Sequence, residues 1–401
     1  MKIFNDPVYG FISFPKTGIL LQIVDHPYFQ RLRRISQTAL THYVYPGALH
    51  TRFHHALGAY HLMTQAVEVL RQKGINITHQ EAEGVYLAIL LHDIGHGPFS
   101  HALEHTIIDY HHEELSLYFM QILNEQFEGK LTLAIEIFTD KYEKKFLHQL
   151  VSGQLDMDRL DYLNRDSYFT GVSEGVIGYD RIIKMLNVVD GELVVEEKAI
   201  YSLEKFLIAR RIMYWQVYLH KTVLAAEQML KKVFERAKEL NLKNVEIPCT
   251  PALKYFFDAL KTGKTKKNIK ELVEYFAMLD DIDIIASLKL WMCHDDYILA
   301  FLSGSILNRK LLKIKLQNAP FTVEEIEKIK RDTLNKSHEK NLNLEYLVFS
   351  GTESNRTYNT TKDAIKILAK TGEVKSITEM MDYELHNKNI YKYYLCYPKY
   401  S

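Results

Sequence analysis

Apolar residues recur along this chain mainly at the spacing of amphipathic helices. From Leu49 to Lys73 they keep that spacing, and Gly74 directly afterwards favours a helix end. Thr78, followed three residues later by Glu81, resembles a capping box, which predicts a helix that starts here and runs to His92. The pattern therefore predicts two consecutive helices over residues 49–92.

Gly95, Gly97 and Pro98 interrupt the helical pattern after His92. Because proline suits the first turn of a helix, a new helix is expected to start at Pro98 or Phe99. The pattern predicts further helices over Leu20–Ile35 (two short helices that meet near His26 and Pro27), His111–Phe127, Asp156–Tyr168 and Ala199–Leu240, with two or three more between Pro251 and Leu307.

Strand signals gather mostly near the C-terminus. Val188 to Gly191, followed by Leu193–Val195, predicts one small hairpin with an Asp-Gly turn. After Lys310 the residue pattern changes. Strands are expected over Leu312–Leu316, Leu344–Ser350 and Ile390–Tyr397, and a helix is expected near Val323–Leu334. The expected fold class is mostly α, with additional helices and a small C-terminal α+β region.

The composition is that of an ordinary globular protein. The 401 residues are 47% apolar and 25% charged, and the formal net charge is zero, so no global field favours nucleic acid or an anionic membrane. Cys249, Cys293 and Cys396 form no CxxC pair, which argues against a disulfide framework or a cysteine zinc knuckle. The start of the chain lacks a signal peptide and no apolar run reaches 18 residues. We expect a cytoplasmic protein.

Histidines are concentrated in one part of the chain. Of 18 in total, twelve lie between His42 and His112, and the segment LLHDIGHGPFSH carries the adjacent pair His92 and Asp93. A hydrophobic core does not need so many titratable rings, whereas a metal-dependent phosphohydrolase site does. A second His-Asp pair, His294 and Asp295, has no histidine-rich surroundings and is expected to be a helix-terminal or surface pair.

Four residues are candidate metal ligands. His92 and Asp93 leave a helix about 100° apart, so one ion at that corner can be reached by both side chains. His55 in HTRFHHALG and Asp158 in LDMDRLDY are the candidates from other segments. Two imidazoles and two carboxylates suit Mn, Fe, Ni or Zn, alone or together with Mg.

Seven short motifs carry a family resemblance. KIFNDPVYGFI, VDHPYFQRLRRISQ, YVYPGALHTRFHHALG, LLHDIGHGPFSH, HHEE, LDMDRLDYLNRDS and YLHK occur in this order between Met1 and about Leu230. The chain thereby resembles the HD-domain deoxynucleoside triphosphate (dNTP) triphosphohydrolases, specifically bacterial relatives of the vertebrate SAM-and-HD-domain enzyme, and no SAM domain is expected. The resemblance implies an HD-domain helical core and hydrolysis of dNTPs to deoxynucleoside and triphosphate, with a dGTPase-like enzyme as one form.

The resemblance also implies residue roles. His55, His92, Asp93 and Asp158 match the family's metal ligands. The catalytic group implied comprises His96, His101, Glu104, His112 and Glu113, with Glu104 in the place of an aspartate of the vertebrate enzyme. The substrate-binding group implied comprises Arg52, Arg159, Tyr162, Asp166, Arg210 and Tyr218, with Arg159 in the place of a phosphate-binding lysine.

Helical spacing supports two parts of this assignment. His101 and Glu104 would lie one turn apart, so the carboxylate could orient the imidazole. Arg210, Tyr214, Tyr218 and Lys221 would share one face of the predicted helix Ala199–Leu240, although that face could equally be a solvated edge. His54 and His61 are interpreted as packing or second-shell groups, and His42, His50 and His79 as structural.

The N-terminal segment matches an activator site of the vertebrate enzyme. The residues concerned are Lys2, Asn5, Asp25, Gln30 and Arg33. They would hold GTP or a dNTP as an allosteric activator, although the segment could instead pack at a subunit interface. The family also implies a homodimer or homotetramer.

The expected organisation has four parts. Residues 1–47 form an N-terminal activator or interface segment, residues 48–230 an HD phosphohydrolase core with its long helix, residues 231–310 a helical extension, and residues 311–401 the small α+β region. The alternatives for function are an HD phosphohydrolase for another nucleotide or phosphomonoester, including cyclic dinucleotides and alarmones, and a non-catalytic nucleotide sensor. Neutral net charge disfavours a nucleic-acid-binding module, and clustered ligands disfavour a scaffold.

Overall fold

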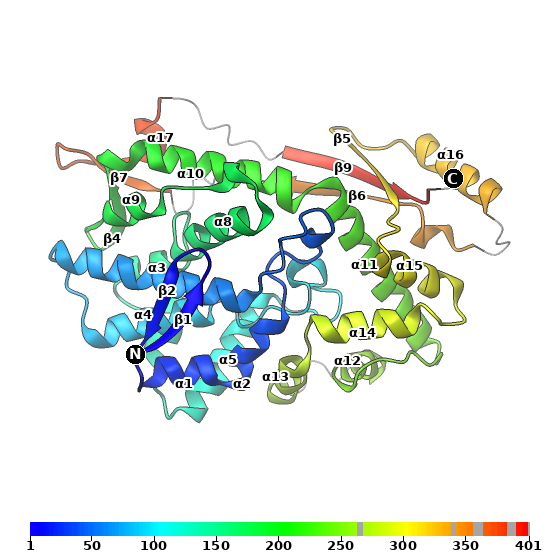
Figure 1. The fold of residues 1–401 in the computed structure, drawn as a ribbon, viewed down its shortest axis with the longest axis horizontal. Helices are drawn as coiled ribbons and strands as arrows, with labels where there is room; N and C mark the ends of the chain where they lie inside the picture. The colour runs from blue at the N-terminus through cyan, green and yellow to red at the C-terminus, as the bar shows by residue number, and fades with distance from the viewer. Residues whose placement is uncertain (263–267, 338–341, 356–363, 383–389, 400–401) are drawn as a thin grey trace.

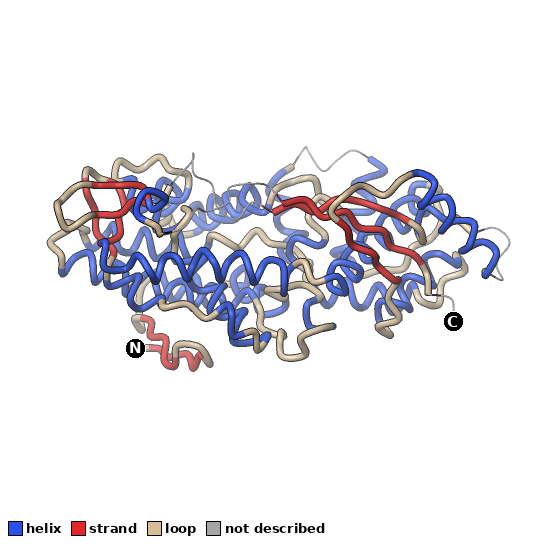
Figure 2. The backbone as a smooth tube through the Cα atoms, turned by 90° about the horizontal axis from the view of Figure 1, so that it is seen from above, coloured by secondary structure: helices blue, strands red, loops and turns tan. Residues whose placement is uncertain are grey.

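The computed structural model describes residues 1–262, 268–337, 342–355, 364–382 and 390–399. These residues form an elongated, mostly helical molecule with small sheets at its periphery (Figures 1 and 2). The fold class is therefore the expected one: helices dominate, and most strands lie in the C-terminal part. No helix in the described ranges combines the length and apolarity needed to span a bilayer.

The central helices come from the first half of the chain. Helix α3 packs against both α4 and α8, and its inner face is buried from Phe53 to Leu70. The helices of this region are α3 (Arg52–Gln72), α4 (His79–Leu91), α5 (His112–Gln126), α6 (Thr132–Phe138), α7 (Lys145–Val151), α8 (Met157–Thr170) and α9 (Tyr179–Lys184). They meet in one hydrophobic core, which fixes the ends of α3, α4 and α8 relative to one another.

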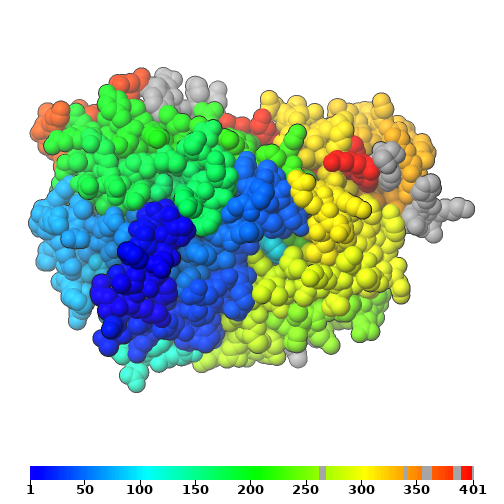
Figure 3. Space-filling model, viewed as in Figure 1, coloured from blue at the N-terminus to red at the C-terminus, as the bar shows by residue number. Residues whose placement is uncertain are grey.

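The N-terminal segment lies on the surface of this core. It forms an antiparallel hairpin followed by two short helices, β1 (Lys2–Asp6), β2 (Gly10–Phe14), α1 (Ile19–Asp25) and α2 (Pro27–Gln30). Figure 3 shows the hairpin in dark blue along the outside of the molecule. Phe14 is nevertheless fully buried and stacks on Tyr60 of α3, so the hairpin is anchored to the central helices.

The predicted helix Ala199–Leu240 is not continuous, and that expectation was wrong. It divides into α10 (Ile200–Met213), a π-helical turn over Tyr214–Tyr218, and α11 (Lys221–Leu242). The His220 side chain caps the second helix, because its Nδ1 accepts a hydrogen bond from the Thr222 backbone N–H at 3.2 Å. No glycine or proline marks the break, so the sequence pattern did not reveal it.

The helix expected at Pro98 is also absent. Only a single 3₁₀ turn forms, over Ser100–Ala102. Phe99 and Ser100 have positive φ angles of 52° and 51°, which helical residues do not adopt. Contacts from elsewhere in the fold hold this turn, since the Phe99 N–H donates to Asp281 Oδ1 at 2.7 Å and Ser100 Oγ donates to the Ser36 carbonyl at 2.9 Å.

Between Pro251 and Leu307 the described residues form four helices, where two or three were expected. They are α12 (Pro251–Thr262), α13 (Ile269–Met278), α14 (Asp281–Trp291) and α15 (Tyr297–Leu307). Beyond them lie β5 (Lys313–Gln317), α16 (Val323–Lys336), β6 (Phe349–Asn355), β7 (Lys366–Leu368), β8 (Val374–Ser376), α17 (Ile377–Met380) and β9 (Ile390–Tyr397). The expected strand Leu344–Ser350 starts only at Phe349, because Leu344–Tyr346 form a 3₁₀ turn.

Two small sheets flank the helices. One has the order β5-β9-β6 and is antiparallel throughout. The other has the order β3-β4-β7-β8, where β3 (Leu186–Val189) and β4 (Glu192–Glu196) form the predicted hairpin with its Asp-Gly turn, and β4 pairs with β7 in parallel. The two sheets lie toward opposite ends of the molecule (Figure 2).

The predicted capping box at α4 is present and carries a buried acid. Glu81 accepts hydrogen bonds from the Thr78 backbone N–H at 2.7 Å, Tyr142 OH at 2.7 Å and Lys144 Nζ at 2.9 Å. Burial works against ionisation of Glu81, but the hydrogen bonds from Lys144, Tyr142 and Thr78 outweigh it and lower the pKa to about 2. Glu81 therefore stabilises the fold as a carboxylate.

Glu81→Gln is expected to lower the free energy of unfolding by about 1–3 kcal/mol near pH 7. Because the lowered pKa exists only in the folded state, this contribution is complete above the ordinary pKa of 4.5 and decreases as the pH falls from there toward 2. Urea unfolding of wild type and variant at about pH 7 and about pH 3.5 measures the difference. Glu83→Gln in the same helix is the control, and an equal loss in both variants would contradict the role of Glu81.

Candidate metal centre and substrate cavity

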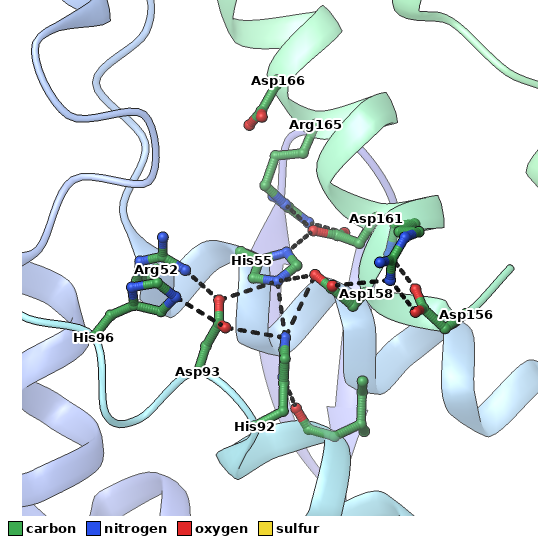
Figure 4. Close-up of polar contacts among 12 residues, drawn as sticks. Arg52, His55, His92, Asp93, His96, Asp156, Asp158, Asp161, Arg165 and Asp166 are labelled. Carbon is green, nitrogen blue, oxygen red and sulfur yellow. Dashed lines mark hydrogen bonds and ion pairs between the residues drawn. The ribbon is translucent and has the colours of Figure 1, made fainter. Parts of the chain in front are cut away.

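The ends of three helices bring the candidate metal ligands together. His55 lies in the first turns of α3, His92 and Asp93 follow the last residue of α4, and Asp158 lies in the first turn of α8. His55 Nε2 is 3.1 Å from Asp158 Oδ1 and 3.4 Å from His92 Nε2. Figure 4 shows the four side chains converging on one region between the helices.

The spacing of these donor atoms suits one divalent cation. Asp93 presents Oδ2 at 3.5 Å from His55 Nε2 and Oδ1 at 3.4 Å from His92 Nε2, and His92 Nε2 is 3.5 Å from Asp158 Oδ1. Metal–ligand bonds of about 2.0–2.2 Å in octahedral or tetrahedral geometry place neighbouring donors about 2.8–3.6 Å apart. His55, His92 and Asp158 bring one donor atom each within 4.8 Å of one another, and Asp93 faces both imidazoles, so the set fits a transition metal ion.

The electrostatics of the cluster also favour a cation. Burial disfavours a charged imidazole, but hydrogen bonds to Asp158 and Asp161 outweigh it and raise the pKa of His55 to about 10. Burial likewise opposes ionisation of Asp158, yet hydrogen bonds from His55 and His92 hold its pKa far below the ordinary value. The negative field that stabilises protons on these imidazoles would equally stabilise a divalent ion in their place.

A second layer of charges orients His55. Its Nδ1 is 2.7 Å from Asp161 Oδ2, and Asp161 accepts from Arg165 Nε at 2.9 Å and Nη2 at 3.0 Å. Arg165 Nη1 in turn donates to Asp6 Oδ2 at 2.7 Å, so the chain of contacts ends on β1. A β-carbon at Gly58 would meet Asp161 Oδ1 at 2.0 Å, which shows that this glycine makes room for the acid.

Sequence reasoning missed Asp161, Arg165 and Asp6. The available signal was the spacing Asp158, Asp161 and Arg165 on one helix, which puts all three on neighbouring faces. His92 is oriented differently, because its Nδ1 lies 2.6 Å from the Ile89 carbonyl oxygen. Both imidazoles are thus fixed through Nδ1 and direct Nε2 toward the other donors, as metal-ligating histidines usually are.

Asp161→Asn is expected to weaken metal binding about 10- to 100-fold. The amide keeps the size of the side chain but cannot balance the buried Arg165 guanidinium or hold His55 with the same charge. Titration of the metal-depleted protein with Mn²⁺ or Zn²⁺ against a chelating dye measures the affinity. Asp180→Asn, an exposed aspartate at the start of α9, is the matched control. Unchanged affinity in Asp161→Asn would contradict the orienting role.

Three further imidazoles lie beside the candidate ligands. His96 stacks on His112 with ring centroids 4.0 Å apart, and His101 approaches both rings. Glu104 joins them, since its two oxygens lie 2.8 Å from His101 Nδ1 and 2.8 Å from His112 Nδ1. A carboxylate can only accept hydrogen bonds, so Nδ1 of both rings carries a proton and Nε2 is left for another partner. Gly95 permits this arrangement, because a β-carbon there would lie 2.2 Å from the His112 carbonyl oxygen.

Burial and charge set the protonation states of this group. Burial opposes ionisation of Glu104, but hydrogen bonds from His101 and His112 outweigh it and hold the pKa far below the ordinary value. Burial and the charge of Arg52 hold the pKa of His96 well below its usual range, so His96 is neutral. The expected contact between His101 and Glu104 therefore exists, although it spans a loop and not a helical turn.

Arg52 connects the two groups. Its guanidinium pairs with Asp93 through Nη1 and donates from Nε to Ser100 Oγ at 2.8 Å. Burial works against ionisation of Asp93, but the charges of His92 and Arg52 hold its pKa well below the ordinary value. Arg52 is 4% exposed, so its charge is available to a ligand in the site and is only weakly screened by solvent.

Arg52, Asp93, His96, His101, His112 and Asp158 border one cavity of about 480 Å³, a size usual for small-molecule sites, and His55, His92 and Glu104 contact these residues from outside the lining. A second wall carries Asp166, which lies 2.6 Å from His50 Nε2 and accepts from Tyr218 OH at 2.6 Å. The residues that line the cavity include Gln37, Thr38, Arg52, Asp93, His96, His101, His112, Asp158, Tyr162, Asp166, Tyr214, Tyr218, Glu227, Gln228, Lys231 and Glu353. His50, interpreted as structural from the sequence, thus fixes a cavity carboxylate.

Family models and relatives show to which family the chain belongs. A model of the HD domain matches residues 52–166, and a model of an HD-associated region matches residues 177–247. The chain is 48% identical to a phosphohydrolase of Bacteroides thetaiotaomicron whose crystal structure covers 99% of this chain and 100% of its own, with a TM-score of 0.94. The chain belongs to the HD-domain phosphohydrolase family. HD domains typically depend on divalent metals, and the candidate ligands lie within the matched domain.

More distant relatives of this HD phosphohydrolase include curated proteins. The YwfO protein of Bacillus subtilis is 32% identical over 78% of this chain and 71% of its own length. The human deoxynucleoside triphosphate triphosphohydrolase SAMHD1 is 31% identical over 60% of this chain and 45% of its own length, and its Dictyostelium discoideum homologue covers 50% of its own length. The chain thus spans about half the length of the SAMHD1 relatives that it matches.

Six of the expected metal-binding, catalytic and substrate-binding residues of the HD phosphohydrolase lie outside the cavity lining. His55, His92 and Glu104 contact residues that line it. The other three are Glu113, Arg159 and Arg210. Glu113 is exposed in the first turn of α5. Arg159 pairs with Asp156 and comes only within 4.0 Å of Asp158 Oδ2, while Arg210 Nη1 donates to Gln154 Oε1 at 3.3 Å. The break after Tyr218 divides the helix face that was expected to carry Arg210, Tyr214, Tyr218 and Lys221. Tyr214 and Tyr218 border this cavity, whereas Lys221 borders a neighbouring one.

Four of the five N-terminal residues matched to an activator site contact one another in two pairs. Lys2 Nζ is 2.7 Å from Asp25 Oδ1, and Arg33 Nε donates to Gln30 Oε1 at 2.8 Å. The Arg33 guanidinium also lies 3.6 Å above the centre of the Phe53 ring, the residue that follows Arg52. Asn5 is exposed on β1. His54 contacts Thr51. His61 contacts Gln65 and the ring of Tyr9.

Proposed function

We propose that this HD phosphohydrolase cleaves dNTPs to deoxynucleoside and inorganic triphosphate. One observation carries the proposal: a single cavity joins two of the metal-ligand candidates, Asp93 and Asp158, to a cationic, imidazole-rich wall on one side and to an Asp-Tyr wall on the other. The first wall suits phosphates and the second suits a sugar. The similarity to SAMHD1 proteins, which are named as dNTP triphosphohydrolases, supports the same substrate class.

The phosphate side is supported by charge. Arg52 would neutralise the triphosphate from within the cavity, and Arg159 would approach from the adjacent turn of α8 once released from Asp156. Positive groups fixed toward developing phosphoryl charge supply a large part of catalysis in this kind of reaction. Arg210 would contribute only after leaving Gln154, so Arg52 is the cation we expect to matter most.

The sugar side is supported by a fixed acceptor. His50 and Tyr218 hold the two oxygens of Asp166, which leaves the remaining lone pairs of the carboxylate for a sugar hydroxyl. The ring of Tyr162 lies beside Tyr218, with centroids 6.3 Å apart, and completes the wall. We propose that this wall admits a deoxyribose.

The proposed mechanism uses the residues as follows. A divalent ion held by His55, His92, Asp93 and Asp158 would supply Lewis-acid activation of water and of a phosphoryl oxygen. Water adds to the α-phosphorus, and the bond between that phosphorus and O5′ breaks. His101, held by Glu104, donates the proton that O5′ needs to leave as a hydroxyl, a step worth about 10²–10⁴-fold. One dNTP and one water thereby give one deoxynucleoside and one triphosphate.

Two further imidazoles complete the site. His96 and His112 direct nitrogen atoms toward the same region as His101 and would hold the α-phosphate in line for attack. Glu113 is too exposed for such a role, and we propose none for it. The native ion would be Mn, Fe, Ni or Zn, alone or with Mg, since the nitrogen and oxygen donors suit all of these.

We extend the proposal to an activator at the N-terminal segment. Asp25 could accept hydrogen bonds from a guanine edge in exchange for Lys2, and Arg33 lies on Phe53, whose neighbour Arg52 borders the cavity. Nucleotide binding there would be coupled to Arg52 through α3, in a homodimer or homotetramer. Turnover measured against GTP concentration tests this, and Arg33→Ala is expected to remove the stimulation while wild-type turnover without GTP is retained.

Product analysis tests the main proposal directly. Protein incubated with each dNTP and with Mn²⁺, Fe²⁺, Ni²⁺ or Zn²⁺ is expected to release deoxynucleoside and triphosphate in equal amounts, measured by ion-exchange chromatography. Orthophosphate or pyrophosphate as the product would overturn the proposal. Turnover of phosphomonoesters, cyclic dinucleotides or alarmones without dNTP turnover would favour another HD phosphohydrolase activity, and tight nucleotide binding without turnover would favour a sensor.

A further inference from the structure

One part of the cavity wall has no role in the mechanism above. It is formed by Glu227, Gln228 and Lys231 of α11 and by Glu353 of β6, and we call it the α11–β6 cluster. Glu227 and Lys231 lie about two and three turns into α11, or about 9 and 15 Å along the helix axis from its first residue. Helix α11 starts just after the π-helical turn that carries Tyr214 and Tyr218.

The charged groups of this cluster are poorly satisfied within the protein. Among the described residues, neither Glu227 nor Lys231 makes a hydrogen bond or an ion pair, and Glu353 accepts only from Gln228 Nε2, at 3.3 Å. Burial raises the pKa of Glu227 to about 8 despite the nearby charge of Lys231, and burial also raises the pKa of Glu353. These three side chains are partly exposed and border the cavity. Charged groups that are largely shielded from bulk water are normally paired, so a cavity wall of this kind is complete only with a polar ligand.

Charge decides which part of a nucleotide faces the cluster. Two acidic side chains offer no counter-charge to a triphosphate, which instead belongs beside Arg52 and the imidazoles. Asp166, held by His50 and Tyr218, already offers an acceptor for the sugar. If the substrate is a dNTP, the base is the part that remains for the cluster.

The donor and acceptor pattern of the cluster distinguishes the bases. As carboxylates, the form that an N–H donor from a ligand favours, Glu227 and Glu353 accept hydrogen bonds, whereas the Lys231 ammonium only donates. Guanine offers N–H donors at N1 and N2 next to the acceptor O6, which matches two acceptors and one donor. Thymine offers carbonyl oxygens on both sides of its single N–H, and these would face the carboxylates unfavourably. The Tyr214 ring borders the same cavity and supplies an aromatic surface of the kind on which bases stack.

We propose that the α11–β6 cluster recognises the guanine ring of the substrate, with Glu227 and Glu353 accepting from its N–H groups and Lys231 donating to O6. This inference rests on the proposed nucleotide hydrolysis for its substrate, but not on which phosphate bond is cleaved. It places base selection on α11 and β6, outside the segment matched by the HD domain model. The metal-ligand candidates and the base contacts thus come from different parts of the chain.

The test compares guanine and thymine in matched variants. Holoenzyme binding is measured by calorimetry with dGTP and dTTP analogues in which a methylene replaces O5′, so that the bond to the α-phosphorus cannot be hydrolysed. Wild type is expected to bind the guanine analogue more tightly. Glu227→Gln, Glu353→Gln and Lys231→Met are each expected to weaken guanine binding about 10- to 100-fold and thymine binding by less than about threefold.

Glu235→Gln is the matched control, because Glu235 lies two turns after Glu227 on α11 but is exposed and pairs with Lys232 at 2.6 Å. It should leave both affinities unchanged. Equal binding of the two analogues by wild type, equal losses for both bases in the variants, or no binding of either analogue would overturn the proposal. Guanine-selective binding with a product other than triphosphate would support the proposal and overturn the proposed reaction, so the two failures are distinguishable.

Discussion

Asp93→Ala is expected to abolish hydrolysis, with a loss of at least about a thousandfold in kcat. The substitution removes the carboxylate that faces both His55 and His92, and it leaves the buried Arg52 guanidinium without its acidic partner. A site with three remaining donors would bind a divalent ion weakly and would misplace the phosphate-binding arginine. Triphosphate release at saturating dNTP and metal measures turnover, and elemental analysis measures bound metal.

The chain contains its own control for this experiment. Asp295 follows His294 in a second His-Asp pair, which lies between α14 and α15 with Asp295 exposed. Asp295→Ala should leave turnover, metal content and the circular dichroism spectrum unchanged. Full activity of Asp93→Ala in saturating metal would show that the corner formed by His92 and Asp93 is not the reaction centre.

His101→Ala is expected to lower kcat about 10²–10⁴-fold, the usual worth of a positioned general acid. Glu104→Gln should cause part of this loss, because an amide holds the Nδ1–H groups of His101 and His112 less strongly than a carboxylate does. Metal content should stay at the wild-type level in both variants, because the proposed ion is held by His55, His92, Asp93 and Asp158 and by neither of these residues. The ratio of kcat values at saturating metal gives the effect.

A nearby histidine provides the comparison for His101→Ala. His105 lies in the same loop, is exposed, and does not border the cavity as the described residues define it. Its φ angle is +57°, so asparagine, which tolerates that conformation, is the appropriate replacement. His105→Asn should keep wild-type turnover. If His101→Ala also kept wild-type turnover, another group would have to protonate O5′.

Local sequence signals predicted the regular elements well. The Thr78–Glu81 capping box, the Asp-Gly turn at Asp190 and Gly191, and the end of α3 before Gly74 all depend on residues a few positions apart. Such signals act through the backbone of the same segment, so the sequence contains them in full. The turn at Phe99 and the break at His220 were missed because they are held by hydrogen bonds that Asp281 and the His220 ring accept, and no short-range pattern in the sequence indicates either one.

The site divides in the same way. Motif resemblance named His55, His92, Asp93 and Asp158, and the fold brings all four together. It also named Arg159 and Arg210, whose charges the structure directs to Asp156 and Gln154. No sequence motif indicated the orienting contact of Asp161. None indicated Glu227 and Lys231 either, whose side chains have no hydrogen bond or ion pair among the described residues. Both features depend on surroundings that only the packed helices create.

The sequence by itself determined the helical class, the helix ends set by caps and turns, and the residues able to bind a metal, since these follow from residue type and short spacing. Tertiary structure alone decided which charges are paired and which face the cavity. The reason is physical: a side chain's partner and its dielectric surroundings come from segments distant in sequence, as Asp6 shows for Arg165 and β6 for Gln228.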